Sequence, residues 1–387
     1  MEKQIVQKKD NKLSNAASSG SGDLPLPLVE NVSGFRSLTS GRVPGFIRGK
    51  APLRISFVGG GTDIPVYYEK YGGAVLCSTM NHYVRISLSP RDDGQISIYS
   101  LDYDVGVKYH LAEPPVYHEA LKLVMAAVSR LNHHTGLTSG FSLSVQSDAP
   151  VGSGLGGSAS LTVALLGTLM EHLRLHQFNK WEIAELAYTV ERLDLGISGG
   201  KQDQYEAAFG GFNLIEFSRD RIVVTPLRLS RDILNDLEHH CLLCYTGRTR
   251  ASARVVDQFK ESVSTGRKDT MDNLNQTHRL VYDMKNALLC GELYDFAEML
   301  DHAWQMKLKH HPEAMVTPAI SEMYHEARRH GAIAGKLLGA GAGGYLLLFC
   351  EGDKKRKVRE RLQKLGGQFM DFSFVDEGVE TWRSNCL

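Results

Sequence analysis

This sequence has no excess of charge of either sign, because 44 lysines and arginines are matched by 44 aspartates and glutamates. A chain balanced in this way has no general electrostatic attraction for nucleic acid or for an acidic membrane surface, so we expect neither as a partner. It also has no apolar run near the roughly 20 residues that a membrane-spanning helix needs. Any anion that the protein binds must therefore be held by a local site.

Cysteine is scarce, with six residues among 387, which is too few for a disulfide-stapled scaffold. Cys241 and Cys244 have the spacing of a metal or redox pair, but no second such pair completes a tetrahedral zinc site. We expect them to be buried cysteines in a strand. With a polar N-terminus that shows no secretory signal, this cysteine usage predicts a cytoplasmic protein.

The amino-acid composition of the chain changes near residue 48. Residues 1–47 mix Lys, Asn, Ser, Gly and Pro with few aromatics, and we expect a disordered or loosely docked extension. Two domains are predicted beyond it, at 48–228 and 229–387. Strands and helices do not alternate one for one, which favours an α+β fold over a doubly wound parallel sheet. Apolar alternation around Asp-Asp-Gly predicts a β-hairpin over residues 84–100.

The stretch SDAPVGSGLGGSASLTVALLG, residues 147–167, places glycines and serines between a predicted strand and a predicted helix. Its G-x-G-x-x-G spacing matches the dinucleotide fingerprint, but residues 158–175 and 180–195 both look helical, leaving no second strand with an acidic end. A Walker A loop lacks its Gly-Lys-Ser/Thr, and a G-x-S-x-G hydrolase elbow is absent. A phosphate cradle at a helix start near Ser158 remains, with a merely flexible, serine-capped loop as the alternative.

Two further glycine-rich segments are KAPLRISFVGGGTDIP, residues 50–65, and KLLGAGAGGYLLLFC, residues 336–350. In order and wording, the three segments resemble the motifs of the GHMP kinase superfamily. Ala51 to Arg54 resembles its first motif, Pro150 to Ala159 its second and Lys336 to Gly344 its third. Residues 51–84, GGKQDQYEAAFGGFN and CYTGRTRASA are similar to the D-glycero-D-manno-heptose 7-phosphate kinases within that superfamily. The resemblance covers residues 48–387.

The resemblance implies a two-domain GHMP kinase fold, with a ribosomal S5 domain 2-like N-terminal ATP-binding domain and a ferredoxin-like C-terminal domain. It implies transfer of the γ-phosphoryl group of ATP to the anomeric hydroxyl of D-glycero-D-manno-heptose 7-phosphate, giving the 1,7-bisphosphate in GDP-heptose biosynthesis. A kinase for fucose, galactose or an octose phosphate is an alternative, as is a non-catalytic relative that senses a sugar or nucleotide. A homodimer is left open.

The resemblance also implies roles for individual residues. Asp203 would accept the proton of the sugar hydroxyl or orient that hydroxyl, and Arg54, which stays protonated, would stabilise developing phosphoryl charge. Ser158 and Glu191 would hold Mg²⁺, directly or through water. Without the resemblance, Glu191 reads as an exposed helix charge and Asp203 as a helix cap. The triphosphate would lie against Pro150, Gly152, Gly154, Leu155, Gly156, Gly157, Ser158 and Ala159.

The substrate is expected to contact residues of the glycine-rich segments 50–65 and 336–350, together with basic residues outside them. Asp63 would hold the sugar ring. Arg248 and Arg250, assisted by Lys201 or Lys307, would bind its phosphate, because guanidinium groups match phosphate oxygens in two-point contact. The remaining expected contacts are Gly60, Gly61, Thr62, Gly341 and Gly343.

Overall fold

The computed structural model describes residues 45–384, apart from 116, 248–252, 311–315 and 342. Of the expected N-terminal extension, only residues 45–47 fall within this range. Ile47 is fully buried and already belongs to the first strand. The remainder of the extension, and the predicted phosphate ligands Arg248 and Arg250, lie outside the described residues.

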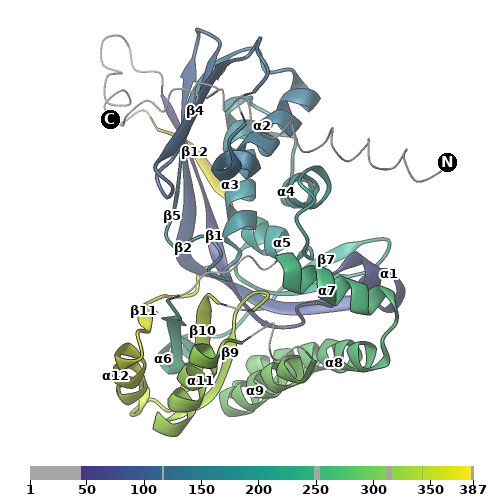
Figure 1. The fold of residues 1–387 in the computed structure, drawn as a ribbon, viewed down its shortest axis with the longest axis vertical. Helices are drawn as coiled ribbons and strands as arrows, with labels where there is room; N and C mark the ends of the chain where they lie inside the picture. The colour runs from purple at the N-terminus through teal and green to yellow at the C-terminus, as the bar shows by residue number, and fades with distance from the viewer. Residues whose placement is uncertain (1–44, 116, 248–252, 311–315, 342, 385–387) are drawn as a thin grey trace, which may run out of the picture. The chain divides into compact units, whose positions relative to one another are not determined.

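An eight-stranded mixed sheet carries the N-terminal half of the site (Figure 1). Its strands run in the order β12-β1-β2-β5-β3-β4, and β6 pairs with both β2 and β7. The 19-residue β2 changes partner along its length, since residues 73–78 pair with β6 and residues 84–91 with β5. The strands are β1 (Phe46–Val58), β2 (Gly73–Arg91), β3 (Gln95–Ser100), β4 (Val105–His110), β5 (Gly140–Ser147), β6 (Phe212–Phe217), β7 (Ile222–Pro226) and β12 (Glu380–Ser384).

Helix α3 (Gly157–His172) is the central helix of this half and packs on β1 and β2. Eleven of its sixteen residues are buried and most of these are apolar, as expected for a helix enclosed by other elements. Figure 1 shows it between the sheet and the outer helices. The other elements are α1 (Pro65–Tyr71), the 3₁₀ turn Glu119–Leu121, α2 (Lys122–Thr135), α4 (Lys180–Tyr188), the π-helical turn Thr189–Asp194 and α5 (Gln202–Phe209).

The predicted hairpin over residues 84–100 is wrong, although both of its strands exist. β5 lies between β2 and β3, antiparallel to the first and parallel to the second. The connection at residues 92–94 therefore crosses the start of β5. Gly140 allows this crossing, because a Cβ there would lie 2.1 Å from the backbone oxygen of Gln95. Alternation and turn composition predict strands and a turn, but they do not say which strand comes between.

A four-stranded antiparallel sheet forms the second part, in the order β11-β8-β10-β9. This strand order, with a helical connection between β8 and β9 and another between β10 and β11, is the ferredoxin-like arrangement. The predicted α+β two-domain fold is thus confirmed. The elements are α6 (Arg231–His240), β8 (Cys241–Tyr245), α7 (Ala253–Ser264), α8 (Lys268–Cys290), α9 (Leu293–His310), α11 (Pro318–His330), β9 (Ala332–Leu337), β10 (Tyr345–Cys350), α12 (Lys355–Lys364) and β11 (Gln368–Met370).

Two smaller expectations can be compared with this architecture. Cys241 and Cys244 are buried free thiols in β8, as predicted. No helix in the described part of the chain is both long enough and apolar enough to cross a membrane. The domain division at 228/229 stays a prediction. The C-terminal strand β12 lies beyond that division in sequence but belongs to the first sheet, where it pairs with β1.

Candidate active site

Arg54 and Asp203 form a two-point ion pair at the centre of the candidate site. Arg54 Nε donates to Asp203 Oδ1 and Arg54 Nη2 donates to Oδ2, each over 2.8 Å. Arg54 lies on β1 and is 4% exposed, whereas the Asp203 side chain, in the first turn of α5, keeps 23% of its surface open. The guanidinium fork fixes the carboxylate while leaving it accessible to a ligand.

The glycine loop at residues 152–156 lies directly against this pair. Gly152, Gly154 and Gly156 have φ of 75°, 81° and 77°, a left-handed conformation that glycine adopts without strain. Arg54 Nη1 donates to the carbonyl of Gly154 over 2.5 Å, and the Arg54 N–H donates to the carbonyl of Leu155 over 3.0 Å. The arginine therefore holds the loop as well as the carboxylate.

Helix α3 begins immediately after the loop, at Gly157, one residue earlier than expected. Its N-cap, Gly156, has no side-chain acceptor, so the N-cap residue leaves the first-turn N–H groups without a side-chain cap. Uncapped N–H groups and the positive end of the helix dipole favour an anion. Of the other predicted nucleotide contacts, Pro150 is exposed beside the loop, whereas Leu155 and Ala159 are fully buried and act in packing.

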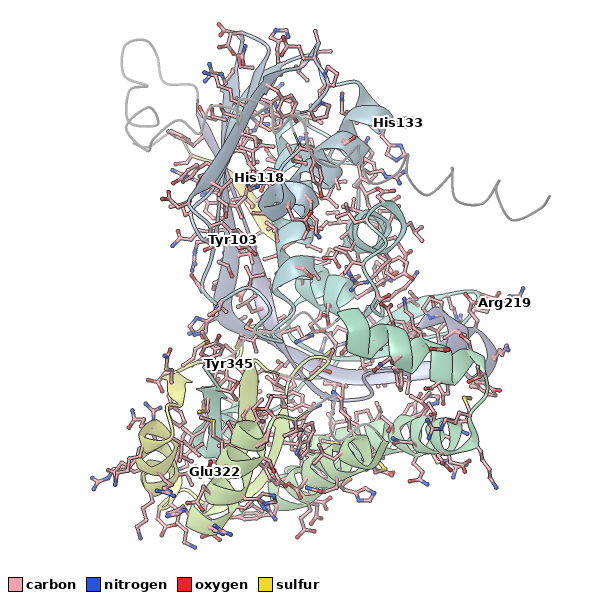
Figure 2. All side chains as sticks on the ribbon, in the orientation of Figure 1. Tyr103, His118, His133, Arg219, Glu322 and Tyr345 are labelled. Atoms are coloured by element: carbon pink, nitrogen blue, oxygen red, sulfur yellow. The ribbon has the colours of Figure 1, made fainter. Side chains whose placement is uncertain are left out.

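The third glycine segment touches the first loop. The N–H of Tyr345, which Figure 2 labels on the side of β10 nearest the first sheet, donates to the carbonyl of Ser153 over 3.0 Å. A Cβ on Gly154 would lie 2.5 Å from the carbonyl oxygen of Leu338, so the two backbones are in direct contact. The predicted residues Gly341 and Gly343 belong to this loop and are buried. The two loops thus join the two sheets at the candidate site.

Ser158 and Glu191 are brought together as the resemblance implies. Glu191 lies in the π-helical turn after α4, a type of irregularity often found at functional sites, and is fully buried. Ser158, which is exposed, hydrogen-bonds to it, as do Gln204 Nε2 and, over 3.3 Å, Thr162 Oγ1. Burial raises the pKa of Glu191, and the Arg192 guanidinium 3.3 Å away opposes that rise.

This donor set fits a magnesium ion. A hydroxyl and a carboxylate are hard oxygen ligands, and the buried side-chain oxygen of Gln204 has no hydrogen-bond partner within the described structure. No group of three or more His, Cys, Asp or Glu residues in the described ranges is arranged as a metal cage. Magnesium needs none, because it commonly binds through one or two protein oxygens together with substrate phosphates and water.

Asp63 lies in the site but is held by the protein itself. Its Oδ1 accepts from the N–H of Gly61 over 3.0 Å, and its Oδ2 accepts from the N–H of Gln202 over 3.1 Å. It is 2% exposed, and burial raises its pKa. Asp63 therefore ties the loop that contains Gly60 and Gly61 to the start of α5, and a contact with the sugar stays a prediction.

Two other predicted substrate ligands have partners within the protein. The hydroxyl of Thr62 is buried among the backbone groups of Gly59 and Ala74, and this geometry favours a structural role. The ammonium group of Lys201 is held by both carboxylate oxygens of Glu185, over 2.7 and 2.9 Å. Lys307 differs from Lys201, because within the described ranges its ammonium group donates to a carbonyl, that of Gly339 over 2.8 Å, and to no carboxylate.

Sequence reasoning missed three residues around the pair. Gln202 links β1 to Asp63, accepting from Ser56 Oγ over 2.7 Å and donating to Asp63 Oδ2 over 3.2 Å. Glu206 follows Asp203 by three positions on α5 and is fully buried. Lys336, in the third motif, donates to carbonyls at the end of β1. The i, i+3 spacing of Asp203 and Glu206 was the available signal, but it shows a shared helix face and not burial.

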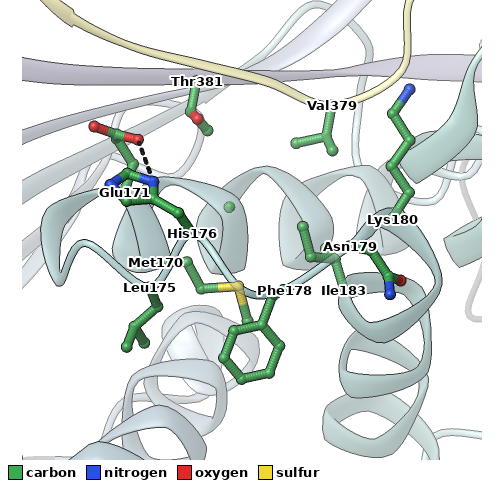
Figure 3. Close-up of a pocket in the computed structure, with 11 residues that line it drawn as sticks. Met170, Glu171, Leu175, His176, Phe178, Asn179, Lys180, Ile183, Val379 and Thr381 are labelled. Atoms are coloured by element: carbon green, nitrogen blue, oxygen red, sulfur yellow. Dashed lines mark ion pairs between the residues drawn. The ribbon is translucent and has the colours of Figure 1, made fainter.

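A separate hollow of about 400 Å³ lies between α3, α4 and β12 (Figure 3). Met170, Phe178 and Val379 line it, together with Glu171, which pairs with His176 over 3.8 Å. It begins at Gly167, ten residues along α3 from Gly157 and hence roughly 15 Å from the helix start. None of the predicted site residues lines it, so the chemistry is argued from the glycine loops.

Comparison with known proteins gives matches across this architecture. Residues 122–211 match the GHMP kinases N terminal domain, and residues 284–368 match the GHMP kinases C terminal domain. Over 339 residues, the chain is 38% identical to D-glycero-alpha-D-manno-heptose 7-phosphate kinase of Campylobacter jejuni, an alignment that covers 87% of this chain and 99% of that protein.

Solved structures agree with the sequence matches. A D-glycero-D-manno-heptose 1-phosphate kinase from Bacteroides thetaiotaomicron superposes with a TM-score of 0.73 at 33% identity, covering 87% of this chain and 98% of that one. Lactococcus lactis galactokinase complexed with galactose superposes with a TM-score of 0.70 at 18% identity, over 87% and 95% of the two chains. The galactokinase shares the fold.

Proposed function

The chain belongs to the GHMP kinase family and is a sugar kinase, and we propose that it phosphorylates the anomeric hydroxyl of D-glycero-D-manno-heptose 7-phosphate. ATP is the phosphoryl donor of this family. The observation that carries the proposal is the two-point Arg54–Asp203 pair lying against a glycine loop at the start of α3. The arrangement brings together the partly exposed carboxylate of Asp203, the buried guanidinium of Arg54 and a loop and helix start that can bind an anion.

We assign Asp203 to the sugar hydroxyl. Its carboxylate accepts the hydroxyl proton, or orients that hydroxyl, as the oxygen forms a bond to the γ-phosphorus and the bond from that phosphorus to the ADP oxygen breaks. Both carboxylate oxygens bond to Arg54 and still have lone pairs for this contact. Arg54 holds the carboxylate in place through two hydrogen bonds, and its fixed charge stabilises the transferring phosphoryl group.

We assign the triphosphate to the loop from Gly152 to Gly157 and to the first turn of α3. Mg²⁺, when bound, would neutralise phosphate charge, and Ser158 and Glu191 would hold it. Phosphoryl transfer depends mainly on positioning and electrostatics, and here the backbone supplies both. As part of the same proposal the enzyme works in the cytoplasm, where free thiols such as those described in this chain are typical. A homodimer is also proposed and is open to test.

The position of the acceptor phosphate is where the relatives' names differ. The Campylobacter enzyme is named for the 7-phosphate and the Bacteroides structure for the 1-phosphate. The test is therefore a panel with Mg·ATP in which the acceptor is heptose 7-phosphate, heptose 1-phosphate, free heptose, fucose or galactose. Phosphorus NMR then identifies the product. A new anomeric phosphate formed only on the 7-phosphate is the expected result.

Asp203→Asn and Arg54→Lys belong in the same experiment. The asparagine keeps the shape but cannot accept a proton as a carboxylate does, and the lysine keeps the charge but loses the two-point fork. We expect each to lower kcat by at least about 100-fold, the lower range for losing general acid–base help. Unchanged turnover in Asp203→Asn would contradict the assignment of the site. Preference for a free sugar would contradict the assignment of the substrate.

A further inference from the structure

Two partly buried lysines, Lys307 on α9 and Lys336 on β9, lie within electrostatic range of Arg54, and the mechanism proposed above uses neither. Lys336 Nζ donates to the carbonyls of Ser56 and Phe57, over 2.8 and 2.7 Å, and so ties the second sheet to the end of β1. Lys307 Nζ donates to the carbonyl of Gly339 over 2.8 Å. Within the described part of the chain, neither lysine forms an ion pair with a carboxylate.

Arg54, Lys307 and Lys336 place three basic groups in this region, and the carboxylates that act on Arg54 are those of Asp203 and Asp63. Arg54 acts electrostatically on both lysines, and Lys307 acts on Lys336. Burial, followed by Arg54, lowers the pKa of Lys307 to about 8. Asp203 already serves Arg54 through both of its oxygens, so it does not balance the lysines. Buried charge without a partner is costly, and clusters of this kind are characteristic of sites that take up a charged ligand.

Lys307 is the member of the cluster with hydrogen-bonding capacity to spare. An ammonium group has three N–H donors, and among the residues that the structure describes Lys307 Nζ makes one hydrogen bond, to the carbonyl of Gly339. A Cβ on Gly339 would lie 2.7 Å from the Cα of Gly154, the residue whose carbonyl accepts from Arg54. Lys307 and Arg54 therefore hold the two loops on either side of one backbone contact, where the loops meet.

We propose that Lys307, on α9, is a further catalytic residue that contacts the transferring γ-phosphoryl group of ATP together with Arg54. The inference rests on the proposed function. Its position favours the transferring group over the distal phosphate of the sugar, because Lys307 lies at the contact between the glycine loops and within the electrostatic reach of Arg54. Phosphoryl transfer relies on cations placed around the equatorial oxygens of that group.

The test compares the binding of Mg·ATP with that of Mg·ADP by calorimetry, without sugar, in the wild type and in Lys307→Met. ADP lacks only the γ-phosphoryl group. We expect the Kd of Mg·ATP to rise about tenfold, the scale of one charged hydrogen bond, and the Kd of Mg·ADP to stay within twofold. Lys355→Met is the matched control, since Lys355, on α12, is also half-buried and donates to carbonyls, those of Glu238 and His239 at the end of α6.

Other outcomes would overturn the inference. Equal weakening of Mg·ATP and Mg·ADP, with a lower Tm, would mean that Lys307 only supports the loop. Unchanged Mg·ATP binding with weaker binding of the sugar phosphate would place Lys307 on the acceptor. Failure of the proposed function would look different. The wild-type enzyme would then phosphorylate no heptose phosphate, while Lys307→Met would still weaken the binding of Mg·ATP more than that of Mg·ADP.

Discussion

Glu206 is a buried carboxyl group whose titration connects a single residue to the stability of the protein. Its Oε2 accepts from Cys77 Sγ and from Asn213 Nδ2, each over 3.0 Å, and its Oε1 has no partner within the described structure. Burial raises its pKa to about 7. The nearby charges are Arg54, which lowers that pKa, and Asp203, which raises it. Glu206 therefore titrates near neutral pH next to the pair proposed for catalysis.

Glu206→Gln is expected to remove one pH dependence of folding. Because the folded pKa lies above the unfolded value near 4.5, the folded state binds more protons between about pH 4.5 and 7. The free energy of unfolding that this group contributes is thus complete below pH 4.5 and is lost as the pH rises through 7. The shift sets an upper limit of about 3 kcal/mol on that loss.

Denaturant unfolding of wild type and Glu206→Gln, measured at intervals from pH 5 to 8, isolates this contribution. The difference between the two curves should favour the variant increasingly as the pH rises and should level off above pH 7. A constant difference across this range would show that Glu206 does not titrate there.

At the scale of single residues, the sequence indicates which residue types could form the site, but it does not show their burial or their hydrogen-bond partners. Arg54, Asp203, Ser158 and Glu191 could be named from motifs, and the structure brings them together. Burial, and pairing with residues distant in the chain, decide the rest. From the sequence, Lys201 was expected to bind phosphate, but in the structure its ammonium group is paired with Glu185. Nothing in the sequence except the helical spacing from Asp203 indicated that Glu206 belongs to the site.

At the scale of elements, apolar periodicity predicts the strands and helices, but it does not predict which of them are neighbours in the fold. The third glycine segment shows why such pairing matters to function. It lies about 180 residues after the first loop in sequence, yet its backbone touches Gly154. Only the folded chain shows that a side chain at Gly154 would meet the carbonyl of Leu338.

Gly154→Ala is accordingly expected to impair the site more than it impairs the fold. The methyl group would lie 2.5 Å from the carbonyl oxygen of Leu338, so the two loops must separate. Gly136→Ala is the matched control, because Gly136 also has positive φ, 62°, but has no atom within 4 Å of its Cβ position. Each variant should lose about 1 kcal/mol of unfolding free energy to backbone strain.

Only Gly154→Ala should also lower kcat/KM for Mg·ATP, by at least about tenfold, which corresponds to about 1.4 kcal/mol of transition-state binding. Steady-state kinetics and thermal melts on the two variants decide the point. Equal kinetics in the two variants would mean that the contact between the loops has no role in catalysis.

At the scale of the whole molecule, the chain does not stay on one side of the predicted boundary at 228/229. After building the second sheet it returns as β12, which pairs with residues 46–50 of β1 and adds the Lys50–Glu380 ion pair at 2.6 Å. Arg54 is four residues farther along β1. The C-terminal strand therefore supports the strand that carries the proposed catalytic cation.

Deleting residues 379–387 is expected to destabilise the first sheet and to lower activity together. The deletion exposes the edge of β1 at residues 46–50 and removes its antiparallel partner, and an unpaired edge also invites association with other chains. We expect a loss of several degrees in Tm, since about 1 kcal/mol shifts the Tm of a protein larger than 150 residues by about 2–4 °C. Deleting only residues 385–387 is the control, because it leaves β12 whole.

If the longer deletion lowers Tm but leaves kcat unchanged at a temperature where the protein is folded, β12 stabilises the sheet without positioning Arg54. A parallel fall in kcat would show that the last strand of the chain acts on the first through β1.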